Sequence, residues 1–563
     1  MITAYSSLFP STRGALIMVY RPSEYREVPP VDLLSWIFEN NGVDPEIDIL
    51  IDAANHGNRL NTRQAVSLIR KLIAGFRMAG LEAGDTVCVH AFNSILYPLL
   101  YFGIIGAGGT FVGSNPAYKS LEIRHLLSIT KPRFLLVEAS LVEIVLPAVG
   151  TCIPTSKILV LDTEPQTCTQ DSFKCWKSLL QHGEHDWIRI SNEMAAKSTI
   201  AVLQLTSGTT GLPKAAATSH YALVAAGVAM RSSEKRPYEI SRLISLPLFH
   251  SFGASFVQIS AFHYDKPTYV MRRFNAEGFI QALNRSKVTE TAVVPAMLAS
   301  IVRQRIPPNM LKRLRRIWCA GSSLSPRLSK AMYELLHGDA VISQVWGMTE
   351  FGRITSSEWC EKDDGSVGKL LPNTEARVID KQGFEVVDAG VQGELEIRGP
   401  SMMNEYSDCP TGTVETLRSG WLKTGDFGYV KNDKVYIVGR IKELIKVRGW
   451  QVSPNEIEDV LLMHPSIIDA AVIGVSRSGT DPVDELPRAY VVINKEEPVS
   501  VDDLEVMRFV QDRLASFKAL GGGVEFVDSI PRSHSGKILR HELRQRAMSK
   551  LATRPIEAET ESQ

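Results

Sequence analysis

The order of helix-like and strand-like segments is the feature that most limits how this chain folds. From residue 61 to residue 438, amphipathic stretches such as 62–78 alternate with short apolar runs of β-forming residues, such as 86–90, 134–137 and 158–161. Such alternation is typical of helices packed on sheets. The pattern therefore predicts an α/β fold built from layered β-sheets and helices.

The sequence pattern changes after residue 438. Short strands are predicted at 470–475, 489–493 and 524–526, together with a helix at 502–514. Another helix is expected to begin at Pro454, because Ser453 and Glu456 have the spacing of a capping box and proline is tolerated in a first helical turn. This part of the chain is predicted to form a smaller α+β domain.

A length of 563 residues exceeds what one compact domain usually holds. We predict a disordered extension at 1–30, a large N-terminal domain at 31–438, a C-terminal domain at 439–548 and a disordered tail at 549–563. The end of the tail is polar, which favours disorder.

Charge and cysteine content exclude several classes of protein. The 62 basic residues balance the 62 acidic residues, and no basic stripe of the kind that binds nucleic acid is present. The seven cysteines are scattered without CxxC spacing, which is untypical of a disulfide-stapled secreted domain. We therefore expect no nucleic-acid partner and a reducing compartment.

Neither a membrane span nor a working targeting signal is predicted. The most apolar segment, 96–111, contains Pro98 and several glycines, so we expect a buried helix followed by a strand. Residues 1–23 lack acidic side chains, as transit peptides do, but a plain extension has the same composition. The peroxisomal tripeptide at 549–551 is not C-terminal in this sequence. A cytoplasmic protein is expected, with the peroxisome or the mitochondrion as alternatives.

One short loop has the composition of a phosphate-binding segment. Residues 205–214 read Leu-Thr-Ser-Gly-Thr-Thr-Gly-Leu-Pro-Lys. Its glycines let backbone N–H groups approach phosphates, its hydroxyls donate hydrogen bonds, and Lys214 supplies positive charge. It is no Walker A loop, because Ala215 stands where that motif has Ser or Thr. An ordinary turn has a similar composition, so the loop alone leaves both interpretations open.

This loop resembles the phosphate-binding signature of the adenylate-forming superfamily, which includes acyl-CoA synthetases, 4-coumarate–CoA ligases and luciferases. The resemblance continues in order through residues 30 to 548. Its further motifs are Asn115-Pro116-Ala117-Tyr118, Pro247-Leu248-Phe249-His250, Ala320-Gly321-Ser322-Ser323, Trp346-Gly347-Met348-Thr349-Glu350, Thr424-Gly425-Asp426, Gly439-Arg440 and Ser535-Gly536-Lys537. The resemblance implies an acid–thiol ligase that forms an acyl-adenylate from a carboxylic acid and ATP, and then an acyl-CoA.

The resemblance also assigns the nucleotide site. Thr349 is implied to contact the α-phosphate and Glu350 to bind Mg²⁺, for which a carboxylate is a suitable ligand. Asp426 is implied to accept hydrogen bonds from the ribose hydroxyls, a contact shared by Arg440. The other implied nucleotide-binding residues are Thr206, Ser207, Gly208, Thr209, Thr210, Gly211, Lys214, Gly321, Ser322, Ser323, Trp346 and Gly347.

Four residues carry the roles that the family gives to its mobile C-terminal domain. Lys537 resembles the lysine that bridges carboxylate and phosphate during adenylation, and Lys442 matches the hinge. Lys446 and Gly449 match the loop that serves acyl transfer, where glycine leaves room for the pantetheine arm of coenzyme A. Taken alone, Lys537 would ordinarily be interpreted as a solvated lysine near the C-terminus.

The acyl pocket is implied to lie near His250. Its expected members are His250, Phe252, Phe256, Pro295 and Gly321. Two phenylalanines predict an apolar pocket. Residues 249–252 contain no counterpart of the aspartate of amino-acid-activating domains, so an α-amino acid substrate is disfavoured. The histidine could equally be a packed core residue.

Departures from the family pattern affect the assignment of the subfamily more than the assignment of the activity. Ala215, Lys423 and Gly439 replace a commoner glycine, histidine and aspartate respectively. The opening at 21–40 resembles fungal secondary-metabolism acyl-CoA ligases, with a fatty or aryl acid as substrate. One alternative is a fatty-acyl-AMP ligase that loads a carrier protein, but the insertion typical of such ligases has no counterpart between Glu350 and Asp426. The other alternative is a non-catalytic nucleotide-binding scaffold.

The resemblance implies that two variants separate the two half-reactions. Lys537→Ala should slow adenylation about a hundredfold or more, because a charge is lost from a closed site, yet still form thioester from supplied acyl-adenylate. Gly449→Leu should accumulate adenylate, because the new side chain obstructs the pantetheine arm. Single-turnover assays of each half-reaction measure both effects. Equal slowing of both half-reactions in folded variants contradicts a domain that presents two faces in turn.

Overall fold

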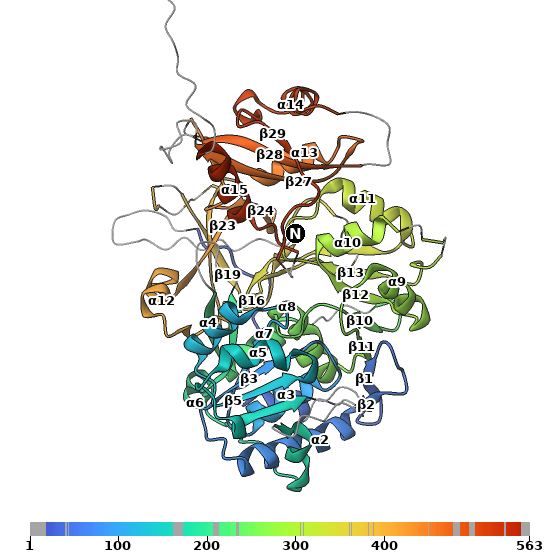
Figure 1. Ribbon diagram of the computed structural model, residues 1–563, viewed down its shortest axis with the longest axis vertical. Helices are drawn as coiled ribbons and strands as arrows, with labels where there is room; N and C mark the ends of the chain where they lie inside the picture. Colours follow the sequence, from blue (N-terminus) through green and yellow to red (C-terminus); the bar gives the residue numbers. More distant parts are fainter. Residues whose placement is uncertain are drawn as a thin grey trace, which may run out of the picture.

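The computed structural model describes residues 18–552 with several gaps. The residues left out within this range are 40–41, 43, 162–172, 207–212, 232–235, 305, 308, 360, 362, 381, 385, 387, 449, 477–484, 495–500 and 534–535. Layers of sheet and helix form a large N-terminal domain, and a smaller C-terminal domain lies at one end of it (Figure 1). This arrangement confirms the predicted α/β class.

An eight-stranded sheet lies at the end of the molecule remote from the C-terminal domain. Its strand order is β21 (Glu405–Ser407), β9 (Lys214–Ser219), β8 (Ile200–Thr206), β4 (Thr110–Ser114), β3 (Thr86–His90), β5 (Phe134–Glu138), β6 (Ile158–Leu161) and β7 (Lys174–Cys175). The strands from β8 to β7 in this order are parallel, whereas β9 and β21 are antiparallel additions.

Helices cover both faces of this sheet. Val87 and Val89 of β3 contribute to the central core with α2 (Thr62–Met78) and α3 (Tyr97–Gly106). Cys88, which points to the other face, packs with α4 (Ser120–Thr130) and α5 (Val142–Val149). Every residue of α3 is buried and β4 follows it, so the prediction of a buried helix and a strand at 96–111 is confirmed.

A second, seven-stranded sheet runs in the order β14 (Val341–Gln344), β13 (Arg316–Cys319), β12 (Glu290–Val293), β10 (Arg242–Ile244), β11 (Thr268–Val270), β1 (Asp48–Asp52) and β2 (Arg59–Asn61). All neighbours are parallel except β1 and β2. The carboxyl ends of parallel strands meet at one edge, so the segments that follow β10, β12, β13 and β14 lie together.

A third, antiparallel sheet carries the end of the N-terminal domain. Its order is β17 (Thr355–Ser356), β18 (Lys369–Leu370), β24 (Lys434–Arg440), β23 (Trp421–Lys431), β20 (Gly393–Arg398) and β19 (Glu375–Ile379), with β22 (Leu417–Arg418) beside β23. The hairpin of β15 (Gly347–Met348) and β16 (Gly352–Arg353) lies between β14 and β17 in the chain.

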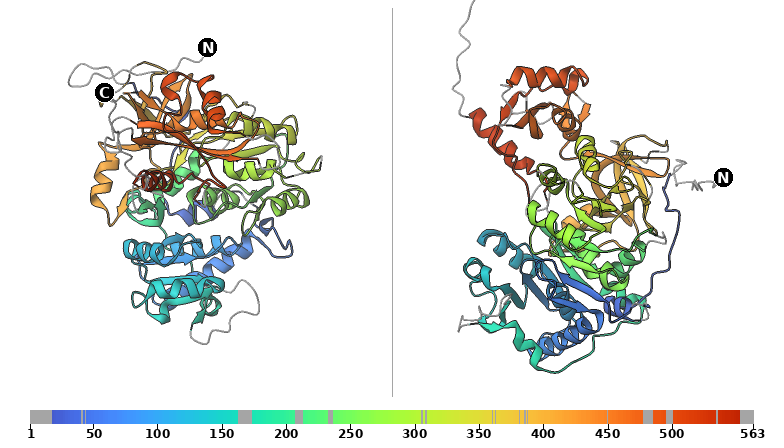
Figure 2. Two further views of the ribbon diagram at one scale, coloured as in Figure 1. Left: turned by 45° about the horizontal axis from the view of Figure 1, so that its top comes forward. Right: turned by 90° about the vertical axis from the view of Figure 1, so that its right-hand side faces the viewer.

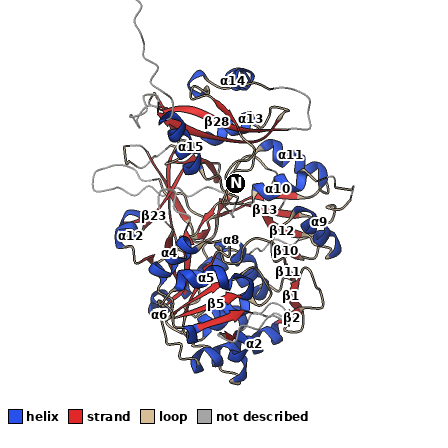
Figure 3. Cartoon of the chain, viewed as in Figure 1, coloured by secondary structure: helices blue, strands red, loops and turns tan. Residues whose placement is uncertain are grey.

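The remaining helices of the N-terminal domain fill the spaces between and around these sheets (Figure 3). They are α1 (Leu33–Phe38), α6 (Glu193–Ser198), α7 (His220–Ala229), α8 (Ser251–Ala254), α9 (Ala276–Arg285), α10 (Pro295–Val302), α11 (Pro326–Leu335) and α12 (Pro410–Thr416). No helix in the described ranges is both long and apolar enough to cross a bilayer.

The C-terminal domain has its own core. It contains a hairpin of β25 (Ile445–Val447) and β26 (Trp450–Val452), a sheet of β27 (Ile467–Ser476), β28 (Glu485–Ile493) and β29 (Val524–Phe526), and the helices α13 (Pro454–Leu461), α14 (Asp503–Gln511) and α15 (Arg540–Ala552). The predicted strands at 470–475, 489–493 and 524–526 and the predicted helix at 502–514 are confirmed. Figure 2 shows this domain resting on the N-terminal domain from two further directions.

Helix α13 begins at Pro454 as predicted, but its predicted capping box is wrong. Ser453 is the N-cap residue and its side chain makes no capping hydrogen bond. The hydroxyl instead donates to the carbonyl oxygen of Val438, at 2.7 Å, while Glu456 pairs with Lys518 at 2.5 Å. Both side chains therefore connect the helix to other elements of the fold instead of closing its first turn.

Contacts with the N-terminal domain place the C-terminal domain over the edge where the parallel strands end. Arg327 of α11 donates to the carbonyl oxygens of Leu462 and His464. The amide of Asn455 donates to the hydroxyl of Ser323, at 3.3 Å. Polar contacts of this kind are typical of interfaces between domains that move.

Arg540 is the buried charge on which the C-terminal domain depends. Its guanidinium pairs with Glu458 and, at 3.1 Å, with Glu443, and it also donates to the carbonyl oxygen of Val472. Arg540→Met leaves Glu458 buried without its partner, and we expect the free energy of unfolding to fall by about 3 kcal/mol or more.

Chemical denaturation followed by a C-terminal-domain probe measures this loss. Arg546→Met on the same helix is the control, because Arg546 pairs with Glu525 from a half-exposed position and its loss should cost under about 1 kcal/mol. Equal stabilities of the two variants would contradict the assignment.

Candidate functional site

The predicted site residues lie where the second sheet, the third sheet and the C-terminal domain meet. His250, Pro295 and Gly321 follow β10, β12 and β13, and Trp346 follows β14. These four segments leave the carboxyl ends of parallel strands, which is where open α/β sheets bind ligands. The C-terminal domain covers this edge (Figure 2).

Glu350 is held by a residue from the edge of the first sheet. The side chain is buried, and its Oε1 accepts a 2.6 Å hydrogen bond from the hydroxyl of Tyr406. Tyr406 pairs with Ala216 in the β21–β9 ladder, so its position is fixed relative to the loop that precedes β9. The Tyr406 ring also lies 4.9 Å from Nζ of Lys214.

The phosphate-loop residues are described only at the two ends of the loop. Thr206 ends β8 and Lys214 begins β9, and the two are register partners. Thr206 is buried and Lys214 is partly exposed. The predicted contacts of Ser207, Gly208, Thr209, Thr210 and Gly211 lie outside the described residues.

Asp426 and Arg440 form the centre of the polar cluster. They are register partners on β23 and β24, and Nε of Arg440 lies 2.7 Å from Oδ1 of Asp426. The other oxygen, Oδ2, accepts a 2.7 Å hydrogen bond from the indole of Trp346. Burial raises the pKa of the Asp426 carboxyl, an effect that Arg440 and Trp346 oppose because both favour the carboxylate.

Lys537 reaches this cluster from the C-terminal domain. Desolvation lowers the pKa of its amino group, and Arg440 lowers it further, whereas Glu443 and Asp426 act in the opposite direction. The preceding Gly536 has φ = 80°, and a Cβ added there would lie 3.0 Å from Cγ2 of Val294 and 3.2 Å from Cβ of Ala296. Glycine is therefore required both by the backbone conformation and by the close approach to α10.

The other predicted C-terminal residues lie apart from this cluster. Lys446 is exposed on β25 between two buried neighbours, and its backbone N–H donates to Glu485 within the same domain. Lys442 is exposed in the turn between β24 and β25. Gly449 falls outside the described residues.

Three of the predicted acyl-pocket residues, His250, Phe252 and Phe256, form an aromatic group at α8 and the turn that follows it. His250 caps α8, and its Nδ1 accepts from the backbone N–H of Phe252, at 3.3 Å. Burial lowers the pKa of the His250 imidazole, which favours the neutral ring. The rings of Phe252 and Phe256 meet edge to face with centroids 5.6 Å apart. Phe256 sits on a π-helical turn at 255–261, a feature that is frequent at functional sites.

The remaining predicted positions differ in their exposure to solvent. Pro295 is buried at the start of α10, whereas Gly321, Ser322 and Ser323 are exposed after β13. Gly347 is exposed on β15, and Thr349 is partly buried.

Three residues near the site were missed by the sequence reasoning. Tyr406 bonds Glu350, Trp318 lies beside Phe256 with centroids 6.3 Å apart, and Arg353 follows Glu350 by three residues. No motif in the segment around Tyr406 indicated that this residue lies at the site. Arg353 had a sequence signal, because it is a cation three residues after Glu350, in a segment expected to contact the nucleotide.

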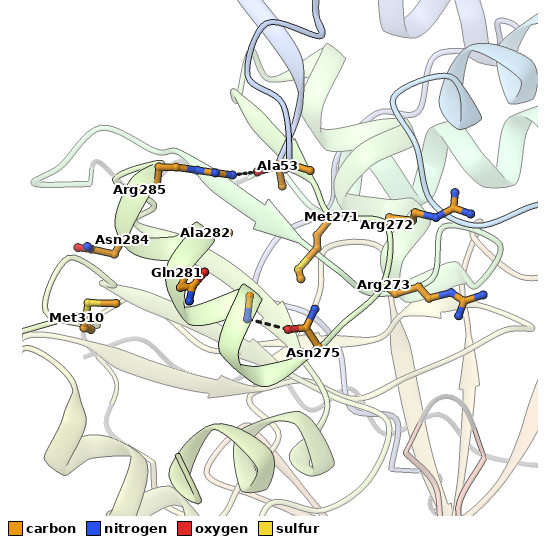
Figure 4. A pocket seen from close by; sticks show the side chains of 12 residues that line it. Ala53, Met271, Arg272, Arg273, Asn275, Gln281, Ala282, Asn284, Arg285 and Met310 are labelled. Carbon is orange, nitrogen blue, oxygen red and sulfur yellow. Dashed lines mark hydrogen bonds between the residues drawn. The ribbon is translucent and has the colours of Figure 1, made fainter. Parts of the chain in front are cut away.

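A separate cavity of about 700 Å³ lies beside α9 and contains none of the predicted site residues. Met271, Arg272 and Arg273 line one side of it, and Gln281 and Arg285 of α9 line another (Figure 4). Because Arg285 donates to the carbonyl oxygen of Ala53 and Arg272 pairs with Glu138, polar side chains of this cavity have structural partners.

Comparisons with known proteins cover most of the chain. The model of the family of AMP-binding enzymes matches residues 37–407, and the model of the AMP-binding enzyme C-terminal domain matches residues 456–537. A phenylacetyl-CoA ligase of Aspergillus niger is 39% identical over 535 residues, covering 93% of this chain and 98% of that protein. A nicotinic acid-CoA ligase of Penicillium canescens is 35% identical over 537 residues, covering 91% and 97%.

Solved structures agree on the fold. The crystal structure of an anthranilate CoA ligase in complex with anthranoyl-AMP superimposes with a TM-score of 0.80 at 22% identity, covering 92% of this chain and 98% of that one.

The environment of Lys537 gives a pH prediction. Its amino group should lose its proton below the ordinary lysine value of 10.5, because the site disfavours the charged form. The native state then binds fewer protons than the unfolded chain between the two pKa values, so the free energy of unfolding rises with pH through that window.

NMR titration of ¹³C-methylated lysines measures this pKa, with Lys537→Arg identifying the resonance. Arg440→Gln removes a neighbouring positive charge and should raise the pKa. A midpoint at or above 10.5 in the unchanged protein would contradict the desolvation of this amino group.

Proposed function

This chain belongs to the family of AMP-binding enzymes, and we propose that the site described above activates a carboxylic acid with ATP and transfers the acyl group to coenzyme A. The protein is an AMP-forming acid–CoA ligase. In the first half-reaction, a carboxylate oxygen attacks the α-phosphorus of ATP and pyrophosphate leaves. In the second, the thiol of coenzyme A attacks the acyl carbonyl and AMP leaves.

The observation that carries the residue assignments is the meeting of Lys537 with Asp426 and Arg440. Lys537 comes from the C-terminal domain, and the charges of Asp426 and Arg440 on the third sheet act on its amino group. Joining two anions requires positive charge between them in a site closed to water. A lysine delivered by a mobile domain supplies that charge only when the domain is closed.

The nucleotide is assigned to the surroundings of this cluster. We assign the ribose hydroxyls to Asp426, with Arg440 beside them, and the α-phosphate to Thr349. The loop that begins after Thr206 and ends at Lys214 is assigned to the phosphates, where backbone N–H groups and a lysine are suitable donors. Trp346 orients Asp426 through the indole hydrogen bond. The predicted contacts of residues 321–323 and of Gly347 complete this assignment.

The residues present fit a magnesium ion at Glu350. Oε1 accepts from Tyr406, whereas Oε2 makes no hydrogen bond with any residue in the described ranges. Groups of three or more potential ligand side chains are absent from the same ranges. One protein carboxylate combined with substrate phosphates and water is the arrangement that Mg²⁺ commonly takes. When bound, the ion would neutralise phosphate charge.

The acid is assigned to the aromatic group beside His250. Phe252 and Phe256 supply apolar walls, and Pro295 and Gly321 follow the neighbouring strands. The neutral imidazole of His250 stands at the start of α8, near the entrance of this group. A fatty or aryl acid suits such walls.

Acyl transfer is assigned to the other face of the C-terminal domain. Lys446 is exposed and its ammonium makes no ion pair with a described residue, so it remains available to serve a second orientation of the domain. Lys442 is the proposed hinge because it lies in the turn where β24 ends. Gly449 is proposed to leave room for the pantetheine arm of coenzyme A.

An ATP–pyrophosphate exchange screen with fatty and aromatic acids, followed by product analysis with coenzyme A, tests the function. We expect exchange that depends on an acid, and acyl-CoA with AMP as products. Glu350→Gln should impair exchange about tenfold or more and raise the magnesium requirement, because one ligand oxygen becomes an amide.

The control variant is Glu361→Gln, which alters a partly buried ion pair with Lys434 away from the Asp426–Arg440 cluster. Normal turnover of Glu350→Gln in magnesium would remove the metal assignment. Transfer to a carrier protein with no transfer to coenzyme A would favour the alternative acceptor.

A further inference from the structure

Four arginines surround one carboxylate beside the proposed acyl pocket. The charges of Arg236, Arg242 and Arg316 act on the carboxylate of Glu290 on β12. The charges of Arg242, Arg316 and Glu290 act on the guanidinium of Arg353. Together they leave an excess of three positive charges in a part of the molecule that is mostly buried. Charges of one sign gather in an interior only where something offsets the cost of desolvation and repulsion.

Three of these arginines have partners within the protein. Nε of Arg242 lies 3.1 Å from Oε2 of Glu290, and Nε of Arg236 lies 3.7 Å from Oε1. Arg316 donates to the hydroxyl of Ser343, at 3.1 Å, and to a backbone carbonyl. Both oxygens of the single carboxylate are therefore occupied.

Arg353 is the exception. Its guanidinium makes no hydrogen bond or ion pair with any residue in the described part of the chain, and its Nε is buried without an acceptor. The side chain as a whole keeps accessible surface, unlike those of Arg242 and Arg316. The fourth arginine therefore has unused donors and an accessible edge.

The position of Arg353 points to the acid substrate. It lies on β16, three residues after Glu350, and β16 packs against α8, where Phe252 is found. Its guanidinium lies 5.1 Å from the centroid of the Phe256 ring and 4.7 Å from that of Trp318. Arg353 is thus placed among the rings that we assign to the acyl group.

The surroundings of Arg353 are costly for a cation. Desolvation lowers the pKa of its guanidinium to about 9, and Arg316 and Arg242 contribute to that shift. An aliphatic residue would line an apolar pocket without this cost, whereas a bound anion would offset it.

We propose that the acid activated by this ligase is a dicarboxylic acid whose second carboxylate, remote from the reacting one, is bound by Arg353. The inference rests on the proposed function and names its substrate class. Arginine donors form a fork that matches a carboxylate, and the excess of positive charge nearby strengthens the attraction. The rings of Phe256 and Trp318 would then contact the spacer between the two carboxylates.

Matched pairs of acids test the proposal by ATP–pyrophosphate exchange. The pairs are hexanoate with adipate, and phenylacetate with 1,4-phenylenediacetate. We expect kcat/KM to favour the dicarboxylate by about tenfold or more in at least one pair. Arg353→Met should reverse that preference, since the monoacid then meets an apolar wall, and Arg353→Lys should retain part of it.

Arg513→Met is the matched control, because Arg513 also lies over a phenylalanine ring, at 3.7 Å, but belongs to the C-terminal domain. It should keep the preference of the unchanged protein. Thermal stabilisation by the dicarboxylate in the absence of ATP, lost in Arg353→Met, provides a readout of binding without turnover.

Two results overturn the inference while leaving the ligase intact. One is a wild-type preference for the monoacid in both pairs. The other is an Arg353→Met variant that loses monoacid and dicarboxylate turnover equally. If none of the acids in the broader screen supports exchange, the proposed function is contradicted as well. The two failures are therefore distinguishable.

Discussion

The ion pair between Asp426 and Arg440 is the contact around which the functional site is arranged. It joins neighbouring strands of the third sheet, and Trp346 ties it to the edge of the second sheet. Lys537 adds a cation from the C-terminal domain. The second sheet, the third sheet and the C-terminal domain thus each contribute a polar group to one point, and none of them holds all of these groups alone.

Burial makes this arrangement electrostatically sensitive. Asp426 is almost inaccessible to solvent, so its carboxylate depends on the two donors that contact it. Lys537 is disfavoured as a cation before substrate arrives, and the phosphates of ATP would reverse that balance. A site that is unfavourable when empty and favourable when filled gives the domain a reason to close around the nucleotide.

Much of the fold was predictable because hydrophobic periodicity determines element type. The buried helix α3 with strand β4, and the strands of the C-terminal domain, were all found from local patterns. Contacts between distant segments were not. The capping box at Ser453 failed because a carbonyl from β24 competes for the hydroxyl, and that carbonyl is invisible to a local pattern.

The candidate site shows the same limit. Ordered motifs located Glu350, Asp426 and Lys537, but the hydroxyl that bonds Glu350 comes from Tyr406, 56 positions away. Arg353 was close to a recognised motif, yet its interpretation depends on Arg242 and Arg316, which come from two other strands. Motifs identify what a family shares, whereas the neighbours that distinguish one member come from tertiary packing.

The hydrogen bond from the Trp346 indole to Asp426 has a spectroscopic consequence. Indole emission responds to the charge that its N–H group meets, and here that charge belongs to the carboxylate assigned to the ribose. A nucleotide that draws the carboxylate toward its hydroxyls alters the electric field at the ring. Comparison of the protein with a Trp346→Phe variant would therefore isolate an emission change that reports nucleotide binding without any added label.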